Sequence, residues 1–88
     1  MSEAGRPMVG LDVGLCEVHT FRNDLVLLEC PGARPPGTRI QLFYPDSGAS
    51  LAQGKVTSVE RLPGEPPRWK LTIKLFSPSK DARRLLSG

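Results

Sequence analysis

The side chains best suited to nucleophilic chemistry in this sequence are its single histidine and its two cysteines. His19 follows Cys16 by three residues, and an odd spacing within one strand places two side chains on opposite faces of a sheet. The pair also lacks a third group that would orient the base. A solvated or hydrogen-bonded structural role for His19 is favoured instead. One histidine and two dispersed cysteines, Cys16 and Cys30, also give no typical zinc-ligand spacing.

The acidic residues show no pairing typical of acid–base catalysis. They are scattered along the chain, mostly in turns or next to basic residues, so we expect solvated surface groups. They include Asp12, Glu17, Asp24, Glu29, Asp46, Glu60, Glu65 and Asp81. The phosphate-binding patterns GxxxxGK[ST] and GxGxxG do not occur in the sequence. The sequence therefore predicts a protein that is not an enzyme and that uses no metal or cofactor.

Basic residues form three groups with the potential to bind an anionic partner. Each group could meet phosphate through charge-assisted hydrogen bonds, or could be the solvated face of an exposed element. The groups are Arg34 with Arg39 beside a proline-rich loop, Lys70 with Lys74 on one expected strand, and Lys80, Arg83 and Arg84 near the C-terminus. The net charge of +3 assists recognition of an anion without requiring it.

Length and composition indicate one small globular domain. A chain of 88 residues buries only a modest core, and 39% hydrophobic with 24% charged residues is typical of folded rather than disordered proteins. Nine prolines and nine glycines, clustered between apolar runs, favour short strands joined by turns. We expect residues 1–8 to be a flexible lead-in and residues 9–88 to form the domain.

Targeting and redox signals indicate a cytoplasmic protein. No stretch approaches the roughly 18 apolar residues of a membrane span, and the N-terminus lacks the basic and apolar blocks of a secretory signal. Cys16 and Cys30 each lie inside an apolar run, which is typical of core thiols in a reducing compartment. We expect no membrane insertion, and the sequence leaves the oligomeric state open.

Alternating apolar residues in the first half predict strands. Val9, Leu11, Val13 and Leu15 alternate strictly, and the change of parity after Gly14 predicts a bulge or a break into two strands. Asn23 and Asp24 predict a turn, because both tolerate left-handed backbone conformations. The continuous apolar run 25–30 predicts a central strand buried on both faces.

The second half predicts three strands and a helix. Residues 38–44 alternate, residues 45–49 have hairpin-loop chemistry, and residues 51–62 form the partner strand with a bulge near Thr57 or Ser58. Residues 69–75 alternate at every position. Ser79 can cap a short helix whose apolar stripe is Ala82, Leu85 and Leu86. These elements predict a mostly β fold, a small antiparallel barrel or rolled sheet with a C-terminal helix.

Residues 35–86 follow the order of elements in a known family. The entry Pro36-Gly37-Thr38-Arg39-Ile40 precedes a hairpin, and Gly54-Lys55-Val56-Thr57-Ser58-Val59 fits a Gly-x-Val-x-x-Val strand. The closing strand is Leu71-Thr72-Ile73-Lys74-Leu75-Phe76-Ser77-Pro78, followed by a helix. In this pattern the chain resembles a PilZ domain, and residues 15–30 stand where that family has its opening strands.

The resemblance implies a bacterial six-stranded barrel, and many members bind cyclic di-GMP. Their ligand motifs are an RxxxR segment before the first strand and a D/N-x-S-x-x-G segment after it. Here only Arg6 precedes Val9, while His19, Phe21 and Asp24 stand where Asp, Ser and Gly belong. Recognition of the dinucleotide needs bidentate arginines and a close-approach glycine, so tight binding is not expected.

The leading hypothesis is a degenerate PilZ-like module that works through protein–protein contacts in bacterial signalling, motility or pilus-linked regulation. Its candidate contact residues are Arg34, Arg39, Lys80, Arg83 and Arg84. Two alternatives remain open. One is a cyclic di-GMP receptor with a non-standard site at Arg6, Arg22 and Arg39. The other is a small nucleic-acid-binding barrel that uses the net charge of +3, although the aromatic residues do not interleave with the basic ones as stacking platforms do.

Overall fold

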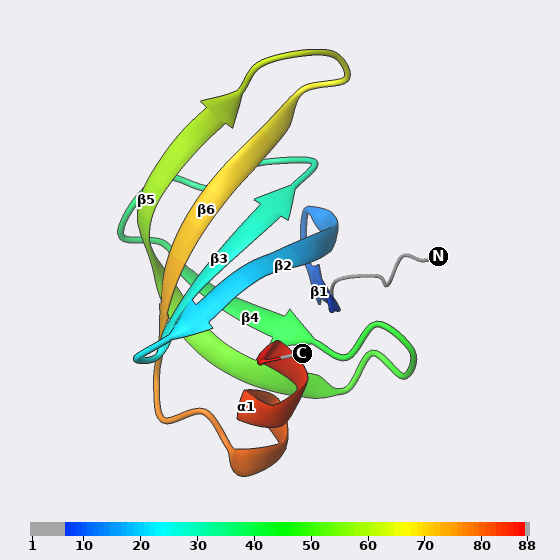
Figure 1. Cartoon of the computed structure of the whole chain (residues 1–88), viewed down its shortest axis with the longest axis vertical. Coiled ribbons are helices and arrows are strands. Elements are labelled where there is room, and N and C mark those ends of the chain that lie inside the picture. The colour runs from blue at the N-terminus through cyan, green and yellow to red at the C-terminus, as the bar shows by residue number, and fades with distance from the viewer. Residues whose placement is uncertain (1–6, 88) are drawn as a thin grey trace.

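The computed structural model of the chain describes residues 7–87 and shows a closed barrel of antiparallel strands with one short helix (Figure 1). The strand order around the barrel is β1-β2-β3-β6-β5-β4, and β1 and β4 close it where Gly10 pairs with Phe43. The elements are β1 (Met8–Leu11), β2 (Gly14–Arg22), β3 (Leu25–Cys30), β4 (Arg39–Phe43), β5 (Ser50–Leu62), β6 (Arg68–Leu75) and α1 (Lys80–Leu86). The predicted mostly β, six-stranded antiparallel barrel with a C-terminal helix is confirmed.

The first two strands differ from the sequence prediction in where the chain turns. Leu11 pairs with Gly14, so the chain reverses at residues 12–13, just before the predicted position. Leu15 was expected to share a buried face with Val9 and Leu11, but it is 55% exposed. The reason is that a new strand begins at Gly14, whose φ of +126° resets which residues face inward.

The strand β1 also begins earlier than expected, at Met8. The backbone carbonyl of Pro7 accepts a hydrogen bond from the Val18 amide at 2.8 Å. Pro7 and Met8 are therefore tied to the barrel, and the remainder of the predicted lead-in, residues 1–6, lies outside the described residues.

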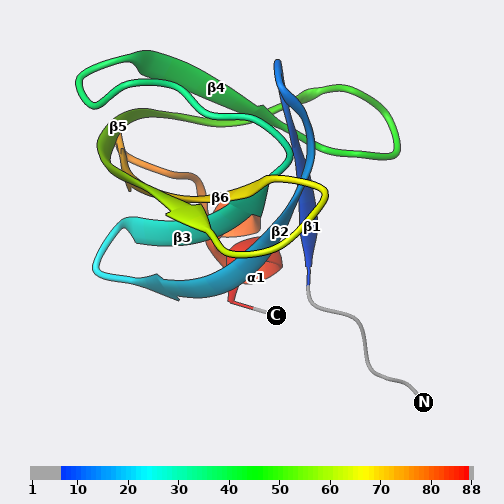
Figure 2. The same cartoon turned by 90° about the horizontal axis from the view of Figure 1, so that it is seen from above.

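Alternate residues of each strand fill the barrel interior. In β3, Val26, Leu28 and Cys30 are buried, whereas Leu25 is 42% exposed and Leu27 is half-buried. The prediction that this strand is buried on both faces is therefore wrong. A barrel wall packs against the core only on its inner side, so an apolar run leaves every second side chain outside. The view from above shows the strands curving around this common interior (Figure 2).

The other predicted local features match the structure. Asn23 and Asp24 form the β2–β3 turn with φ values of 53° and 63°. The register of β5 shifts between Val56 and Ser58, which is the predicted bulge. Ser79 caps α1 by accepting a hydrogen bond from the Ala82 amide at 3.1 Å.

The helix α1 packs against the end of the barrel at which β2 ends and β3 begins (Figure 1). Ala82 and Leu86 belong to the core, and Leu85 packs against it. The guanidinium of Arg83 lies 3.0 Å from a carboxylate oxygen of Asp24, which links the helix to the β2–β3 turn. In the described part of the chain, no helix has the length and apolar character that crossing a membrane requires.

The two cysteines are buried free thiols, as expected for core residues. A hydrogen bond with the Cys30 thiol, together with burial, raises the pKa of the Cys16 thiol. Cys16 faces the core while His19 reaches Glu29 on the outer side of the wall, so the two do not meet. This separation agrees with the parity argument from the sequence.

Candidate functional site

A line of cationic side chains crosses the outer face of the barrel. The strand register pairs Arg39 of β4 with Lys55 of β5, and Lys55 with Lys74 of β6. Lys74 is paired with Leu25 of β3, and Leu25 with Arg22 of β2. Directly paired residues project from the same face of a sheet, and all five side chains are exposed. We call Arg22, Leu25, Lys74, Lys55 and Arg39 the basic row.

The charges of the basic row are not balanced inside the chain. Lys55 lies directly between Arg39 and Lys74, and like charges on opposing strands are destabilising. Among residues 7–87, no carboxylate forms an ion pair with any of the four cations of the row. Arg39 instead lies over the ring of Phe76, 5.9 Å from its centroid, which is cation–π geometry. The row is therefore a strip of positive potential that an external anion can neutralise.

Other basic residues singled out from the sequence are neutralised by neighbours. Arg34 lies 2.9 Å from a carboxylate oxygen of Asp12, and Arg83 binds Asp24. Lys70 lies 3.9 Å from Glu60. Of the five predicted contact residues, Arg39 belongs to the basic row, Lys80 and Arg84 are exposed on α1, and Arg34 and Arg83 are ion-paired.

The structure also places the residues of the alternative nucleotide site. Arg22 and Arg39 lie at the two ends of the basic row, on the outer face of the same wall. Arg6 lies outside the described residues. Sequence reasoning missed Lys55, because its importance comes from being paired on both sides with cations. The only sequence signal for it is an outward position in an alternating strand.

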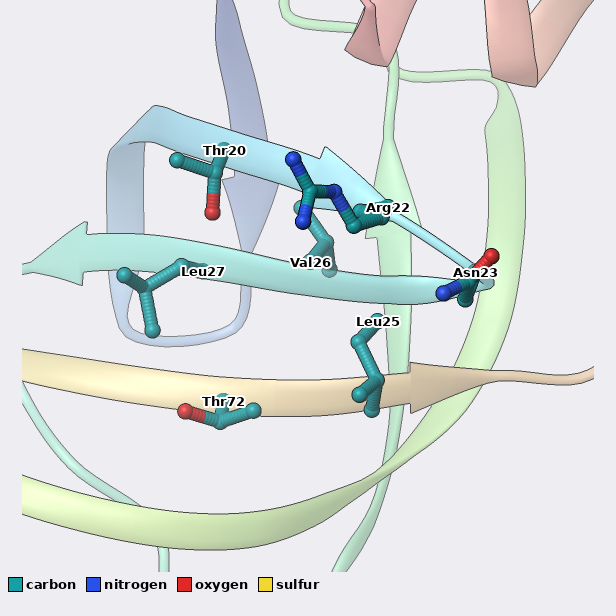
Figure 3. A pocket seen from close by; sticks show the side chains of 7 residues that line it. All are labelled: Thr20, Arg22, Asn23, Leu25, Val26, Leu27 and Thr72. Carbon is teal, nitrogen blue, oxygen red and sulfur yellow. The ribbon is translucent and has the colours of Figure 1, made fainter.

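A pocket adjoins one end of the basic row (Figure 3). Its volume is about 270 Å³ and its wall is mainly apolar. It is lined by Thr20, Arg22, Asn23, Leu25, Val26, Leu27 and Thr72. In Figure 3 the side chain of Arg22 extends along β2 toward Thr20, over the apolar part of the wall. Drug-sized ligands usually occupy pockets of about 300–1,000 Å³, so this pocket is suited to a smaller group such as one side chain.

A second polar cluster lies on the outer face at the other end of the same strands. Glu17 and Glu29 are paired across β2 and β3, and His19, two residues after Glu17, projects from the same face. His19 Nε2 is 2.9 Å from Glu29 Oε1, and the Nε–H of Arg68 donates to Glu29 Oε2 at 3.0 Å. Strand pairing thus brings together two of the carboxylates that the sequence showed as scattered.

This cluster has the donor types of a metal site. One ligand atom from each of Glu17, His19 and Glu29 lies within 4.8 Å of the others, a set suited to a transition metal. However, both oxygens of Glu29 already have hydrogen-bond partners in His19 and Arg68. These bonds account for the geometry without an ion, so we interpret the cluster as an ion-pair network.

The network predicts a specific dependence of stability on pH. A hydrogen bond from Arg68 lowers the pKa of the Glu29 carboxyl, burial opposes this shift, and a hydrogen bond with His19 adds to it. Because the folded pKa lies below the ordinary value of 4.5, the carboxylate stabilises the fold above that pH. This stabilisation is lost as the pH falls through the lowered folded pKa.

We expect Glu29→Gln to be less stable than the wild type near neutral pH, with the difference shrinking between about pH 5 and pH 3. Urea unfolding at a series of pH values measures this difference. In an Arg68→Gln background, the same Glu29→Gln change should have a smaller effect and a weaker pH dependence. A Glu29→Gln penalty that stays constant across this pH range would contradict the prediction.

Comparison with known proteins gives no relatives for this chain. No protein-family model matches the sequence, and no significant match to a curated protein or a solved structure was found.

Proposed function

We propose that this chain is a non-catalytic, PilZ-like binding module that acts through protein–protein contacts in bacterial signalling, motility or pilus-linked regulation in the cytoplasm. The observation that carries the proposal is the basic row, in which Lys55 lies between two other cations without a carboxylate partner among the described residues. Such an arrangement costs stability in the free protein and is explained if an anionic partner covers it.

Two observations support the PilZ-like part of the proposal. The fold is a closed six-stranded barrel with a C-terminal helix, as in that family. Asp24, at the position of the family's motif glycine, has a φ of 63°, the left-handed conformation that glycine adopts most readily.

The cytoplasmic part of the proposal is supported by the buried free thiols of Cys16 and Cys30, which are typical of a reducing compartment.

The same positions argue against tight binding of cyclic di-GMP. His19 contacts Glu29 and Asp24 contacts Arg83, so both motif positions already have partners within the chain. Phe21, at the position of the motif serine, packs against the core. The alternative is that a cyclic dinucleotide binds through Arg22 and Arg39. Its only support is that both arginines project from the outer face of the barrel wall.

The test compares partner capture by three forms of the purified chain. They are the wild type, Lys55→Gln/Lys74→Gln in the basic row, and a control with the same charge change on α1, Lys80→Gln/Arg84→Gln. We expect a protein partner that the wild type and the helix variant retain and the row variant loses. The free energy of unfolding of the row variant should equal that of the wild type or exceed it by up to about 1 kcal/mol, because the variant removes like-charge neighbours.

Two results would count against the proposal. Equal retention of the partner by the row variant would show that the basic row is not the contact surface. Titration with cyclic di-GMP at about 150 mM salt is the second measurement, since this salt screens weak surface attraction. If the wild type binds cyclic di-GMP and the row variant does not, the ligand of the basic row is the dinucleotide and not a protein.

A further inference from the structure

The outer face of the barrel carries its charges in separate bands. Beyond the basic row lies a band of Thr20, Leu27, Thr72 and Ser58, which are neighbours across β2, β3, β6 and β5. Beyond this band, Glu17, Glu29, Lys70 and Glu60 are neighbours across the same strands. Lys74 and Lys70 are four residues apart on β6, so this third band, in which carboxylates are paired with cations, lies about 13 Å from the basic row.

These bands limit the direction in which an anionic partner can lie on the barrel. A partner running along the strands leaves the basic row within two residues and then meets Glu29 and Glu60, where the cations Arg68 and Lys70 are already paired with these carboxylates. A partner that crosses the strands stays over cations from β2 to β4, a path of four strand spacings or about 19 Å. The structure therefore favours a short anionic segment that lies across the strands.

The same surface favours a protein segment over nucleic acid. Single-stranded nucleic acid binds to basic grooves in which aromatic rings stack on its bases. The exposed aromatic ring beside the row is Phe76, and the guanidinium of Arg39 covers one of its faces. Between Arg22 and Lys74, near one end of the row, lies Leu25, an exposed aliphatic side chain that lines the pocket. An acidic peptide with an apolar side chain matches both features.

The spacing of the row sets the spacing within such a peptide. From Leu25 on β3, the neighbouring strands β6, β5 and β4 lie about 5, 10 and 14 Å away. An extended peptide advances about 3.4 Å per residue, so residues two and four positions along it reach about 7 and 14 Å. The first distance falls between Lys74 and Lys55, and the second reaches Arg39.

We infer that the basic row binds an extended acidic peptide segment whose apolar side chain enters the pocket beside Leu25 and whose carboxylates, two and four residues away, contact Lys74, Lys55 and Arg39. This inference rests on the proposed function and adds the chemistry of the partner. The mainly apolar wall of the pocket suits the apolar side chain, and the exposed cations Lys74, Lys55 and Arg39 lie outside the pocket lining. The charged and apolar parts of the segment therefore occupy separate positions.

The experiment uses a labelled peptide with a central leucine and with glutamates two and four residues to either side. The symmetrical design removes the need to know the direction of the chain. Two control peptides replace the leucine with serine or all glutamates with glutamine. Fluorescence anisotropy at about 150 mM salt measures the dissociation constants, with exposed charges screened beyond about 8 Å.

We expect Lys55→Gln/Lys74→Gln to raise the dissociation constant about tenfold, because it removes two exposed ion pairs. The helix control Lys80→Gln/Arg84→Gln should bind as the wild type does. Leu25→Gln should weaken the leucine peptide and leave the serine peptide unchanged, which tests the pocket separately from the charges. Leu25 is exposed, so this change spares the core.

Several outcomes would overturn the inference. If the serine peptide binds as tightly as the leucine peptide, there is no apolar anchor. If an oligonucleotide of equal length binds more tightly than the peptide and depends on Lys55 and Lys74, the partner is a nucleic acid. If no peptide binds while the captured partner still depends on the basic row, the inference fails and the proposed function stands. If neither peptide binding nor partner capture depends on Lys55 and Lys74, both the inference and the proposed function are refuted.

Discussion

Gly54→Ala is expected to lower the free energy of unfolding by about 3 kcal/mol, a typical large cost of overpacking a core. Gly54 is buried on β5, paired with Ile40 of β4 on one side and Leu75 of β6 on the other. A Cβ atom there would lie 2.6 Å from the backbone oxygen of Lys74 and 2.7 Å from Cγ2 of Ile73. The β6 backbone is held by its pairing with both β3 and β5, so it cannot move away cheaply.

The matched control is Gly10→Ala on β1. A Cβ atom at Gly10 would lie 3.6 Å from Cβ of Phe43, an ordinary van der Waals contact. Urea unfolding followed by the fluorescence of Trp69, the only tryptophan, measures both variants. Domains of this kind have net stabilities of about 5–15 kcal/mol, so the Gly54 effect should be a clear shift of the midpoint. Equal stability of the two variants would show that β5 and β6 do not approach so closely.

Leu71→Ala should also cost about 3 kcal/mol, within the range of buried leucine truncations. Leu71 is completely buried on β6, where it is paired with Leu28 of β3 and Val59 of β5. Removing three heavy atoms there leaves a cavity that a wall fixed on both sides cannot fill. The result tests whether the inner face of β6 is the centre of the core.

The comparison for this variant is Leu15→Ala, the same chemical change at a side chain that is 55% exposed. We expect a change within about 0.5 kcal/mol, as for most surface substitutions. Equal losses at Leu71 and Leu15 would mean that the chain buries the face that the alternation of Val9, Leu11, Val13 and Leu15 first indicated. Thermal unfolding by circular dichroism provides a second measurement of the same pair.

Local sequence patterns were sufficient where one face of a strand alternates without interruption. The positions of β6, the β5 bulge, the Asn23–Asp24 turn and the Ser79 cap were all predicted correctly, because each depends on neighbours close in the sequence. The prediction failed for Leu15 and for the outer face of β3. Leu15 faces outward because the chain reverses before Gly14 and a new strand begins there, and the outer face of β3 is exposed because a barrel wall packs against the core only on its inner side.

The candidate site could be predicted only in part. Arg39 and Lys74 were recognised as basic residues of interest, and Arg22 entered through the alternative nucleotide site. The sequence did not indicate that Arg34 and Arg83 are neutralised by Asp12 and Asp24, which come from distant parts of the chain. It also did not indicate that Glu17, His19 and Glu29 meet, because this requires the register that pairs Glu17 of β2 with Glu29 of β3.

The sequence by itself therefore determined a small β-rich fold, its turns and its capped helix, because periodicity and turn chemistry act over a few residues. The tertiary structure alone decided the basic row. Arg22, Leu25, Lys74, Lys55 and Arg39 come from five strands, and only the register between those strands places them side by side. Register is set by barrel closure and by the bulges in β2 and β5, which move every following side chain to the other face.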